Sequence, residues 1–305
     1  MVTINLLIQQ IVNGVFFGLI FGMIALGLSI IWGVSRIINV AHGEFIIVGA
    51  YITIVFYNVF NVNPSKFDLY SMVMMFIIII LSGLVVAFVG VLIQYFLYAR
   101  IKGDISLNSL IISFGIAVLL TALLVLFFTG DFKAPVGGSN ALSLKSIKIG
   151  GFLLVKYGYL FAGLIAIIVF LGAYLFLEKT DVGRAIRAVA QDSEVAPLMG
   201  IDNKKIYLLA MLLSAFIAGV AGSVAATLYT TTPFMGNSYL GWSFAITVLA
   251  GLGNIQGILI SGILIGIARA LTSSFYPGLE SSVGFFIMII VILFRPRGLF
   301  GKVTE

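Results

Sequence analysis

The sequence has 305 residues, of which 61% are hydrophobic and 9% are charged, and its mean hydropathy is +1.21. Soluble domains carry about 25% charged residues, so an ordinary water-soluble fold is excluded. The absence of cysteine excludes disulfides, thiolate metal sites and cysteine nucleophiles. The net charge is +6, but the basic residues are scattered over loops and form no stripe. The sequence therefore gives no support for nucleic-acid binding. The composition indicates a polytopic helical membrane protein.

Nine apolar segments are candidates for membrane-crossing helices, which need about 20 apolar residues each. In chain order they are Leu6–Val34, Val40–Phe60, Leu69–Ala99, Ile105–Thr129, Tyr157–Leu177, Ile206–Thr230, Leu240–Leu252, Ile255–Phe275 and Val283–Phe294. The first is too long for a cleaved signal peptide and is expected to be retained. The seventh and ninth are short, and the seventh and eighth could form a re-entrant hairpin. We predict an all-α bundle of eight or nine transmembrane helices in one domain, residues 1–305.

Lysine and arginine predict the orientation, because basic loops remain in the cytoplasm. If the loop 179–205 is cytoplasmic and all nine segments cross, eleven basic residues share its side and five lie opposite. The eleven are Arg36, Arg100, Lys102, Lys179, Arg184, Arg187, Lys204, Lys205, Arg295, Arg297 and Lys302; the five are Lys66, Lys133, Lys145, Lys148 and Lys156. This bias predicts an external N-terminus and a cytoplasmic C-terminus. Arg269 lies in the eighth segment and is expected to snorkel outward.

The loop 130–156 is external in this scheme. Its second half, 143–156, reads SLKSIKIGGFLLVK. Polar and apolar residues alternate up to Ile149, and Gly150-Gly151 then precedes an apolar run, which predicts a small β-hairpin with a primed turn. A polar loop with a chance pair of glycines is the alternative.

Glycines recur at four-residue spacing on two of the predicted helices, a pattern that allows close packing of helices in lipid. They are Gly14, Gly18 and Gly22 on the first segment and Gly262 and Gly266 on the eighth. Such faces can hold a static bundle, and they can also let helices slide.

Polar residues gather at the start of the second segment, where Asn39, His42, Gly43 and Glu44 lie within six positions. They could serve as caps or as a structural network, since a glutamate is favourable at a helix start. They could instead line or gate a translocation pathway, because ionisable groups at membrane depth are costly and often functional. The stripe Gln9, Gln10 and Asn13 adds polar groups to the first segment.

The loop 179–205 is the most charged part of the chain; with Glu178 it holds five acidic and five basic residues. We expect Asp181 to cap a short helix that runs to Asp192. A second short helix is expected over Glu194–Leu198, with Gly200 as its C-terminal stop.

One face of the expected helix is apolar, and the other carries arginine and glutamine. The apolar face contains Ala185, Ala188 and Val189, and the polar face contains Arg184, Arg187 and Gln191. We interpret the apolar patch as a docking surface for a soluble partner that pushes on the spans. A surface helix lying on lipid headgroups is the alternative, but balanced charge disfavours it, because anionic lipid attracts net positive charge.

Four strings in this order resemble the permease family of branched-chain amino acid ABC importers. They are NVAHGE (39–44) followed by VGAY (48–51), GRAIRAVAQD (183–192) with LMGI (198–201), VLAGLGNIQG (248–257) and RPRGLFG (295–301). The compact size resembles the shorter of the two permease subunits. The resemblance implies a location in the cytoplasmic (inner) membrane of a prokaryote and a role in the inward transport of leucine, isoleucine or valine.

The resemblance also implies partners: a second homologous permease subunit, two cytoplasmic ATPase subunits and an external substrate-binding protein. ATP and Mg²⁺ would be used by the ATPase subunits, and this chain would bind no cofactor. The coupling loop of the family maps onto Gly183, Arg184, Arg187, Ala188, Ala190, Gln191, Asp192 and Gly200. The string Ala188-Val189-Ala190 stands where the Glu-Ala-Ala motif of other importer classes would be sought. The resemblance therefore does not identify which of these residues contact the ATPase.

An enzymatic role is not expected. The sequence has no G-x-x-x-x-G-K-[ST] motif and only one histidine, so neither a nucleotide-hydrolysing site nor a catalytic constellation is visible. Two alternatives remain: a permease for urea or other small amides or amino acids in the same superfamily, and a secondary transporter or channel. His42 and Glu44 motivate the second.

Overall fold

The computed structural model describes residues 4–64, 68–101, 105–134, 145–150 and 153–301. All nine predicted segments are helices, so the all-α polytopic fold is confirmed. They are α1 (Ile4–Ser35), α2 (His42–Val59), α3 (Leu69–Phe96), α4 (Ile105–Phe128), α6 (Tyr157–Lys179), α8 (Asn203–Leu228), α9 (Gly236–Ala250), α10 (Ile255–Phe275) and α11 (Val283–Phe294). Shorter elements are η1 (Tyr98–Arg100), β1 (Ser146–Ile149), β2 (Leu153–Lys156), α7 (Asp181–Gln191), η2 (Ala196–Met199), η3 (Pro233–Met235) and η4 (Pro277–Leu279).

Helix length separates two classes of span. Within the described ranges, seven helices are long and apolar enough to cross a bilayer. Helix α9 has 15 residues and α11 has 12. At about 1.5 Å per residue both are shorter than a hydrocarbon layer of about 30 Å. Length alone therefore does not decide between eight and nine crossings.

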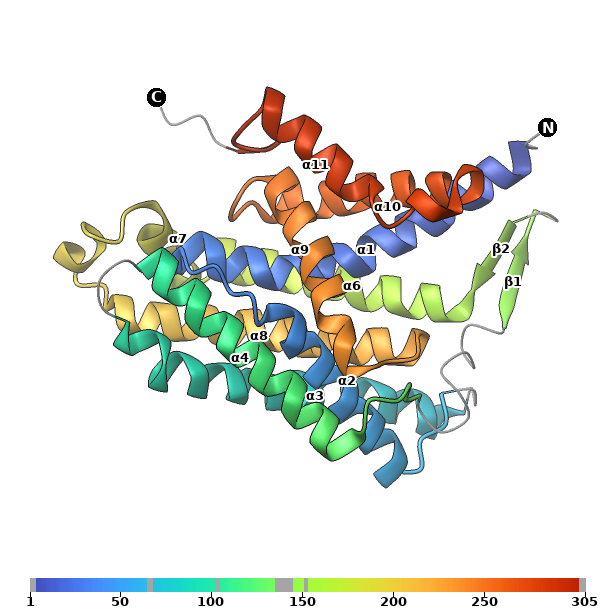
Figure 1. Cartoon of the computed structure of the whole chain (residues 1–305), viewed down its shortest axis with the longest axis horizontal. Coiled ribbons are helices and arrows are strands. Elements are labelled where there is room, and N and C mark those ends of the chain that lie inside the picture. The colour runs from blue at the N-terminus through green and yellow to red at the C-terminus, as the bar shows by residue number, and fades with distance from the viewer. Residues whose placement is uncertain (1–3, 65–67, 102–104, 135–144, 151–152, 302–305) are drawn as a thin grey trace.

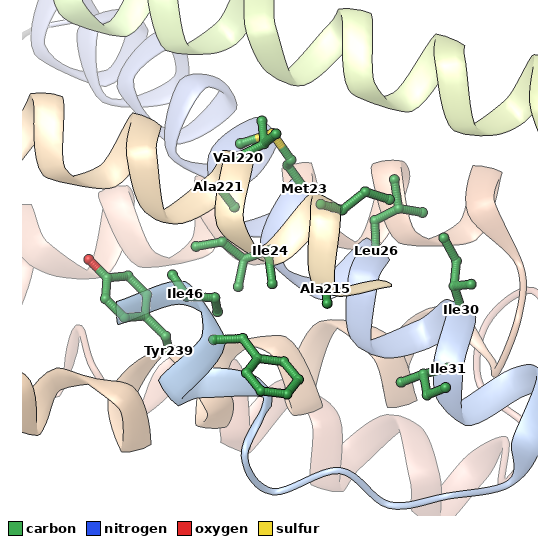
Figure 2. Packing of buried hydrophobic residues seen from close by; sticks show 14 of the residues in the cluster. Met23, Ile24, Leu26, Ile30, Ile31, Ile46, Ala215, Val220, Ala221 and Tyr239 are labelled. Carbon is green, nitrogen blue, oxygen red and sulfur yellow. The ribbon is translucent and has the colours of Figure 1, made fainter. Parts of the chain in front are cut away.

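Helix α1 is the centre of the bundle. In its most apolar stretch 83% of residues are buried, whereas the figure for α4 is 22%, which places α4 on the lipid-facing side. Figure 2 shows side chains of α1, among them Met23, Ile24 and Leu26, packed with Ile46 of α2 and Val220 of α8. The enclosed stretch of helix α1 is apolar on all its faces because neighbouring helices surround it and none of its faces meets a polar environment.

Helices α1 and α10 run antiparallel and are in close backbone contact. A Cβ built on Gly14 would lie 2.5 Å from the Cα of Ile267, and one on Gly18 would lie 2.6 Å from the Cα of Ile263. A Cβ on Gly262 would lie 3.0 Å from the Cα of Gly22. The glycine spacing in the sequence therefore marks an interface at which two backbones touch. In lipid such packing replaces the hydrophobic effect as the force that holds helices together.

Helices α2 and α9 begin inside the bundle rather than at its surface. Arg36, whose φ is +55°, turns the chain after α1, and the following residues return into the interior. His42, the first residue of α2, contacts the carbonyl oxygen of Ile24 at 3.1 Å. Ile24 lies eleven residues before the end of α1, about 16 Å along its axis. Gly43 packs directly on Gly236, the first residue of α9, so two helix starts meet there.

The two ends of the bundle differ in structure. Figure 1 shows α7 at one end and the hairpin β1–β2 at the other, beside the start of α1. The strands pair antiparallel, from Ser146 opposite Lys156 to Ile149 opposite Leu153, in the segment where the sequence predicted a hairpin. Gly150 has a φ of +61°, as a primed turn requires, whereas Gly151 lies outside the described residues.

Gln9 fixes the hairpin to α1. Its Nε2 donates to the carbonyl oxygen of Leu154 at 2.8 Å, and its Oε1 accepts from the nitrogen of Leu154 at 2.7 Å. The amide side chain thus imitates a neighbouring strand. One member of the predicted polar stripe therefore has an anchoring role.

The α1–α10 contact predicts that Gly18→Ala destabilises the bundle. The new methyl group would collide with backbone atoms that cannot move alone, and overpacking of this kind costs about 1–3 kcal/mol. Gly172→Ala on α6 is the matched control, because a Cβ there meets no described atom within 4 Å. Chemical unfolding of the purified protein in detergent should show a loss of stability for Gly18→Ala alone. Equal stability of both variants would contradict the close contact.

The Gln9 contact predicts that Gln9→Met releases the hairpin. Methionine keeps the length of the side chain but removes both hydrogen bonds, each worth about 1 kcal/mol. Hydrogen–deuterium exchange at the amide of Leu154 should become faster by about tenfold or more. Gln10→Met is the control and should leave that amide unchanged; unchanged exchange in both variants would show that Gln9 does not hold the hairpin.

Candidate functional site

The turn between α6 and α7 is held by Thr180. Its Oγ1 accepts a hydrogen bond from the nitrogen of Gly183 at 3.0 Å and donates one to the carbonyl oxygen of Phe176 at 2.6 Å. The prediction that Asp181 caps this helix is therefore wrong. A hydroxyl can serve the end of one helix and the start of the next at once, whereas a carboxylate only accepts. Asp181 is instead exposed and forms an ion pair with Arg184.

Gly183 allows α7 to fold tightly against the end of α6. A Cβ at this position would lie 2.6 Å from the Cα of Leu177 and would also collide with the carbonyl oxygens of Phe176 and Leu177. Any larger residue would push the two helices apart. The predicted coupling residue Gly183 therefore has a geometric reason to be glycine.

The apolar face of α7 is turned toward the bundle. Ile186 and Val189 are only 2% and 1% exposed, and Ala185 and Ala190 pack beside them against the core. The expectation that Ala185, Ala188 and Val189 form an exposed docking patch is wrong. An amphipathic helix at the end of a bundle buries its apolar stripe on the nearest apolar surface, which here is its own chain.

An exposed apolar patch follows α7 instead. Val195 is 50% exposed, Leu198 83% and Met199 78%; we call these three residues the coupling knob. Two of them lie in η2, which spans Ala196–Met199 rather than the predicted Glu194–Leu198. Gly200, with a φ of +81°, ends this turn as predicted. Apolar side chains this exposed in a polar loop are typical of a surface that a partner covers.

The polar residues of α7 divide between two roles. Arg184 and Gln191 are exposed at the surface of the loop. Arg187 is half-buried, and its Nη1 lies 3.4 Å from Oε2 of Glu178, near the end of α6. Arg187 therefore ties α7 to the bundle as much as it faces outward.

Asp192 ends α7 and organises the turn that presents the knob. Its Oδ1 accepts hydrogen bonds from the nitrogens of Glu194 at 2.8 Å and Val195 at 3.0 Å. The Val195 and Glu194 donors, with a further contribution from the charge of Arg36, hold the pKa of the Asp192 carboxyl below its usual value. Arg36 belongs to the connector between α1 and α2, so the loop lies near the chain segment that leads to Asn39.

Asn39 and His42 are fully buried, and the side chain of each makes one hydrogen bond to the described residues, while Nδ2 of Asn39 and Nδ1 of His42 have no partner among them. Tyr98 of η1 donates its hydroxyl to Oδ1 of Asn39 at 3.2 Å, and Nε2 of His42 bonds to the carbonyl oxygen of Ile24. Because a carbonyl oxygen only accepts, Nε2 carries the proton. The N-cap of α2 is Ala41, with no side-chain cap among the described residues, so the capping alternative for Asn39 and His42 is wrong. The pathway role of these residues stays a prediction.

Glu44 lies where α2 and α9 begin. It is 4% exposed, packs on the backbone of Gly236 and receives a hydrogen bond from Thr121 of α4. A carboxylate beside helix starts is stabilised by their free amide groups and dipoles. Oε2 of Glu44 has no hydrogen-bond partner among the described residues. The described residues also contain no cluster of three histidine, aspartate or glutamate side chains that could hold a metal ion.

The segments 248–257 and 295–301, which are far apart in the sequence, contact each other. The nitrogen of Leu299 donates to the carbonyl oxygen of Leu249 at 2.8 Å, and Nδ2 of Asn254 donates to the carbonyl oxygen of Phe300 at 2.9 Å. The nitrogen of Gly253, in the α9–α10 turn, donates to Oγ of Ser29 on α1 at 3.1 Å. The C-terminal segment thus closes over the turn at the α7 end of α1, a contact that no spacing in the sequence could have indicated.

Arg269 does not snorkel. Its guanidinium lies 4.0 Å from the ring centroid of Phe17 on α1, and its Nη2 lies 3.3 Å from Oε1 of Glu280. Both side chains are partly buried, at 28% and 33% exposure. The expectation of an outward-pointing arginine is wrong because a carboxylate and an aromatic face within the protein are available as partners.

Comparison with known proteins covers nearly the whole chain. The family model described as "Branched-chain amino acid transport system / permease component" matches residues 10–293. The chain is 29% identical to the high-affinity branched-chain amino acid transport system permease protein BraD of Pseudomonas aeruginosa, over 97% of this chain and 96% of that protein. It is 27% identical to the corresponding protein LivH of Escherichia coli K12, again over 97% and 96%.

A second permease protein of the E. coli system, LivM, is also similar, with 23% identity over 92% of this chain and 68% of LivM. The family match includes seven of the nine predicted spans in full and most of the first and the ninth, together with the loop 179–205 and the buried string at 39–44. The chain therefore belongs to the family of permease components of branched-chain amino acid transport systems.

Proposed function

We propose that this chain is the membrane-spanning permease subunit of an ABC importer that moves branched-chain amino acids inward. The match of residues 10–293 to the permease family carries the proposal, because it includes both the bundle and the loop that projects from it. Relatives of nearly equal length are named as high-affinity branched-chain amino acid permeases. Leucine, isoleucine and valine are the substrates this supports.

The partners follow from the same proposal. A second permease resembling LivM completes the pathway, two cytoplasmic ATPase subunits use ATP and Mg²⁺, and an external binding protein delivers substrate. This chain itself binds no cofactor and catalyses no reaction. The exposed coupling knob supports an ATPase contact, because burial of a leucine-sized side chain gains about 1.5–3 kcal/mol.

The proposed orientation places α7, the coupling knob and the C-terminal segment in the cytoplasm. The loop 130–156 and the N-terminus are then external. The first turn of α1 and the segment 295–301 lie at opposite ends of the bundle (Figure 1), which favours an odd number of crossings. Nine crossings fit if the short helices α9 and α11 both traverse, and the start of α9 inside the bundle lets 15 residues suffice.

Force applied to the knob has a continuous route into the bundle. Asp192 fixes the turn that carries the knob and lies near Arg36, from which the chain re-enters the interior toward Asn39. His42, Gly43 and Glu44 then lie against α1 and α9. We assign the string 39–44 a gating role on this route: a tilt of α7 would shift the starts of α2 and α9 and so open one side of the pathway.

A secondary transporter or channel is the second candidate, supported by the buried carboxylate of Glu44 at membrane depth. Uptake by the reconstituted chain alone, driven by an ion gradient and insensitive to ATP depletion, would establish it and exclude the importer. Uptake of urea rather than leucine by the full assembly would instead correct only the substrate.

The knob predicts that Leu198→Glu abolishes coupling without loss of folding. Leu198 is 83% exposed, so the substitution removes no internal contact. Replacing the buried docking contact by a charge should weaken ATPase association by at least about tenfold. Copurification of the ATPase subunits and ATP-driven leucine uptake in proteoliposomes measure the effect. Lys204→Gln, on an exposed residue of the same loop, is the control; normal uptake by Leu198→Glu would exclude the knob as the docking point.

Asp192 predicts a graded series in which Asp192→Ala impairs coupling more than Asp192→Asn. Asparagine keeps an acceptor for the two backbone donors but loses the charge, and alanine loses both. Because the folded pKa of Asp192 is lowered, its contribution is complete above the usual carboxyl pKa of 3.8 and disappears as pH falls below that value. Exchange of the Glu194 and Val195 amides, corrected for intrinsic rates, should rise in the same order and at low pH. Identical exchange in all three proteins would show that the carboxylate does not hold the turn.

A further inference from the structure

A cavity of about 600 Å³ lies at the hairpin end of the bundle. Its walls come from the first half of α1, the last turns of α10, the hairpin, the start of α6 and the residue that follows η4. Among the lining side chains are Gln10, Asn13, Phe17, Tyr159, Arg269 and Glu280. Figure 1 shows these elements converging at the end opposite α7. The volume is within the range of about 300–1,000 Å³ that is usual for small-molecule sites.

The cavity is lined by two positive side chains, Lys156 and Arg269, and one negative side chain, Glu280. Arg269 and Glu280 are in direct contact, whereas Lys156 lies over the ring of Tyr159 at 5.7 Å. Arg269 and Glu280 meet through a single pair of atoms, Nη2 and Oε1, at 3.3 Å. A guanidinium has five N–H donors, and the contact with Glu280 involves only Nη2, while Nε is buried without a hydrogen-bond partner among the described residues. The arginine is held in place by the ring of Phe17 at 4.0 Å, with Trp242 at 5.7 Å. Donor capacity therefore remains on a side chain whose position is fixed.

The chemistry of this pair selects one class of solute. A free α-amino acid carries an ammonium and a carboxylate on the same carbon, and a guanidinium beside a carboxylate offers a partner to each. Arginine favours carboxylates because its fork of donors matches two oxygens. A solute with only a negative charge would compete with Glu280 for Arg269 and leave the Glu280 carboxylate without a partner, and one with only a positive charge would meet Arg269 and Lys156. Phe17 adds an apolar surface for an aliphatic side chain, and Gln10 and Asn13 add neutral donors and acceptors.

We infer that this cavity is a low-affinity reception site for zwitterionic α-amino acids, with Arg269 binding the carboxylate and Glu280 the ammonium. The inference rests on the proposed function, which places the hairpin end outside the cell, and it deepens that function by naming where the permease itself first holds its substrate. A pair that is already formed in the empty site must be exchanged for ligand contacts. Binding is therefore weak, which suits a site that must pass its solute onward.

The test is direct binding of L-leucine to the purified permease assembly without its binding protein, measured by equilibrium dialysis. We expect saturable binding with a dissociation constant on the order of millimolar. The monocharged analogues 4-methylpentanoate and 3-methylbutylamine, and neutral urea, should each bind at least about tenfold more weakly. The analogues need no mutation, so this arm stands even if a variant misfolds. No saturable leucine binding, or equal binding of 4-methylpentanoate, overturns the inference.

Two variants place the site. Arg269→Gln and Glu280→Gln should each weaken leucine binding by about tenfold or more. Glu178→Gln is the matched control, because it breaks an ion pair of similar length, 3.4 Å, at the opposite end of the bundle and should leave leucine binding unchanged. Wild-type binding by both cavity variants would overturn the inference, because the pair would then be only a structural tie.

ATP-driven uptake by the wild-type assembly with its binding protein distinguishes failure of the reception site from failure of the proposed function. If the wild type imports leucine while the cavity variants bind it normally, only the reception site is wrong. If the wild type imports no branched-chain amino acid, the proposed function itself is wrong, whatever the cavity binds.

Discussion

Contact between helix backbones is the constraint on which the rest of this structure depends. A bundle in lipid gains little from burying apolar side chains, because the lipid is equally apolar, so helices must associate through packing. Helix α1 meets α10 along glycines and is enclosed over most of its length. The same kind of contact recurs where Gly49 of α2 packs on Gly219 of α8. These contacts fix where each helix begins and ends relative to α1, and thereby where the polar groups can lie.

Placement of α2 and α9 shows the consequence. Because both helices begin beside the middle of α1, their unpaired amide ends lie in the interior, where they need partners. Glu44 lies at this junction, and the chain that leads to it carries the hydrogen bonds of Asn39 and His42. Irregular backbone at membrane depth is tolerated only when it is enclosed by protein, as it is here.

The loop 179–205, to which we assign a coupling role, has a buried face and an exposed face that differ in their contacts. Ile186 and Val189 fasten α7 to the bundle, while Val195, Leu198 and Met199 face outward. A loop that is rigid on the inside and apolar on the outside can transmit a push, whereas a loop with both faces exposed would deform. Polar and charged groups are similarly divided between the two ends: the loop and the C-terminal segment at one end, and the hairpin with the Arg269–Glu280 pair at the other.

The sequence by itself determined the class of protein, the nine helices and most of their bounds, since long apolar runs leave a chain in lipid no other regular structure. It also indicated the glycine interface, the hairpin and the charged loop 179–205. Tertiary structure alone decided which face of α7 is buried, that Thr180 rather than Asp181 caps it, and that Arg269 pairs with Glu280 inside a cavity. Each of these depends on partners that are distant in the sequence or on competition between adjacent groups, and periodicity carries no information about either. The contact between Leu299 and Leu249 has the same origin, because only the folded chain brings residues fifty positions apart within hydrogen-bonding distance.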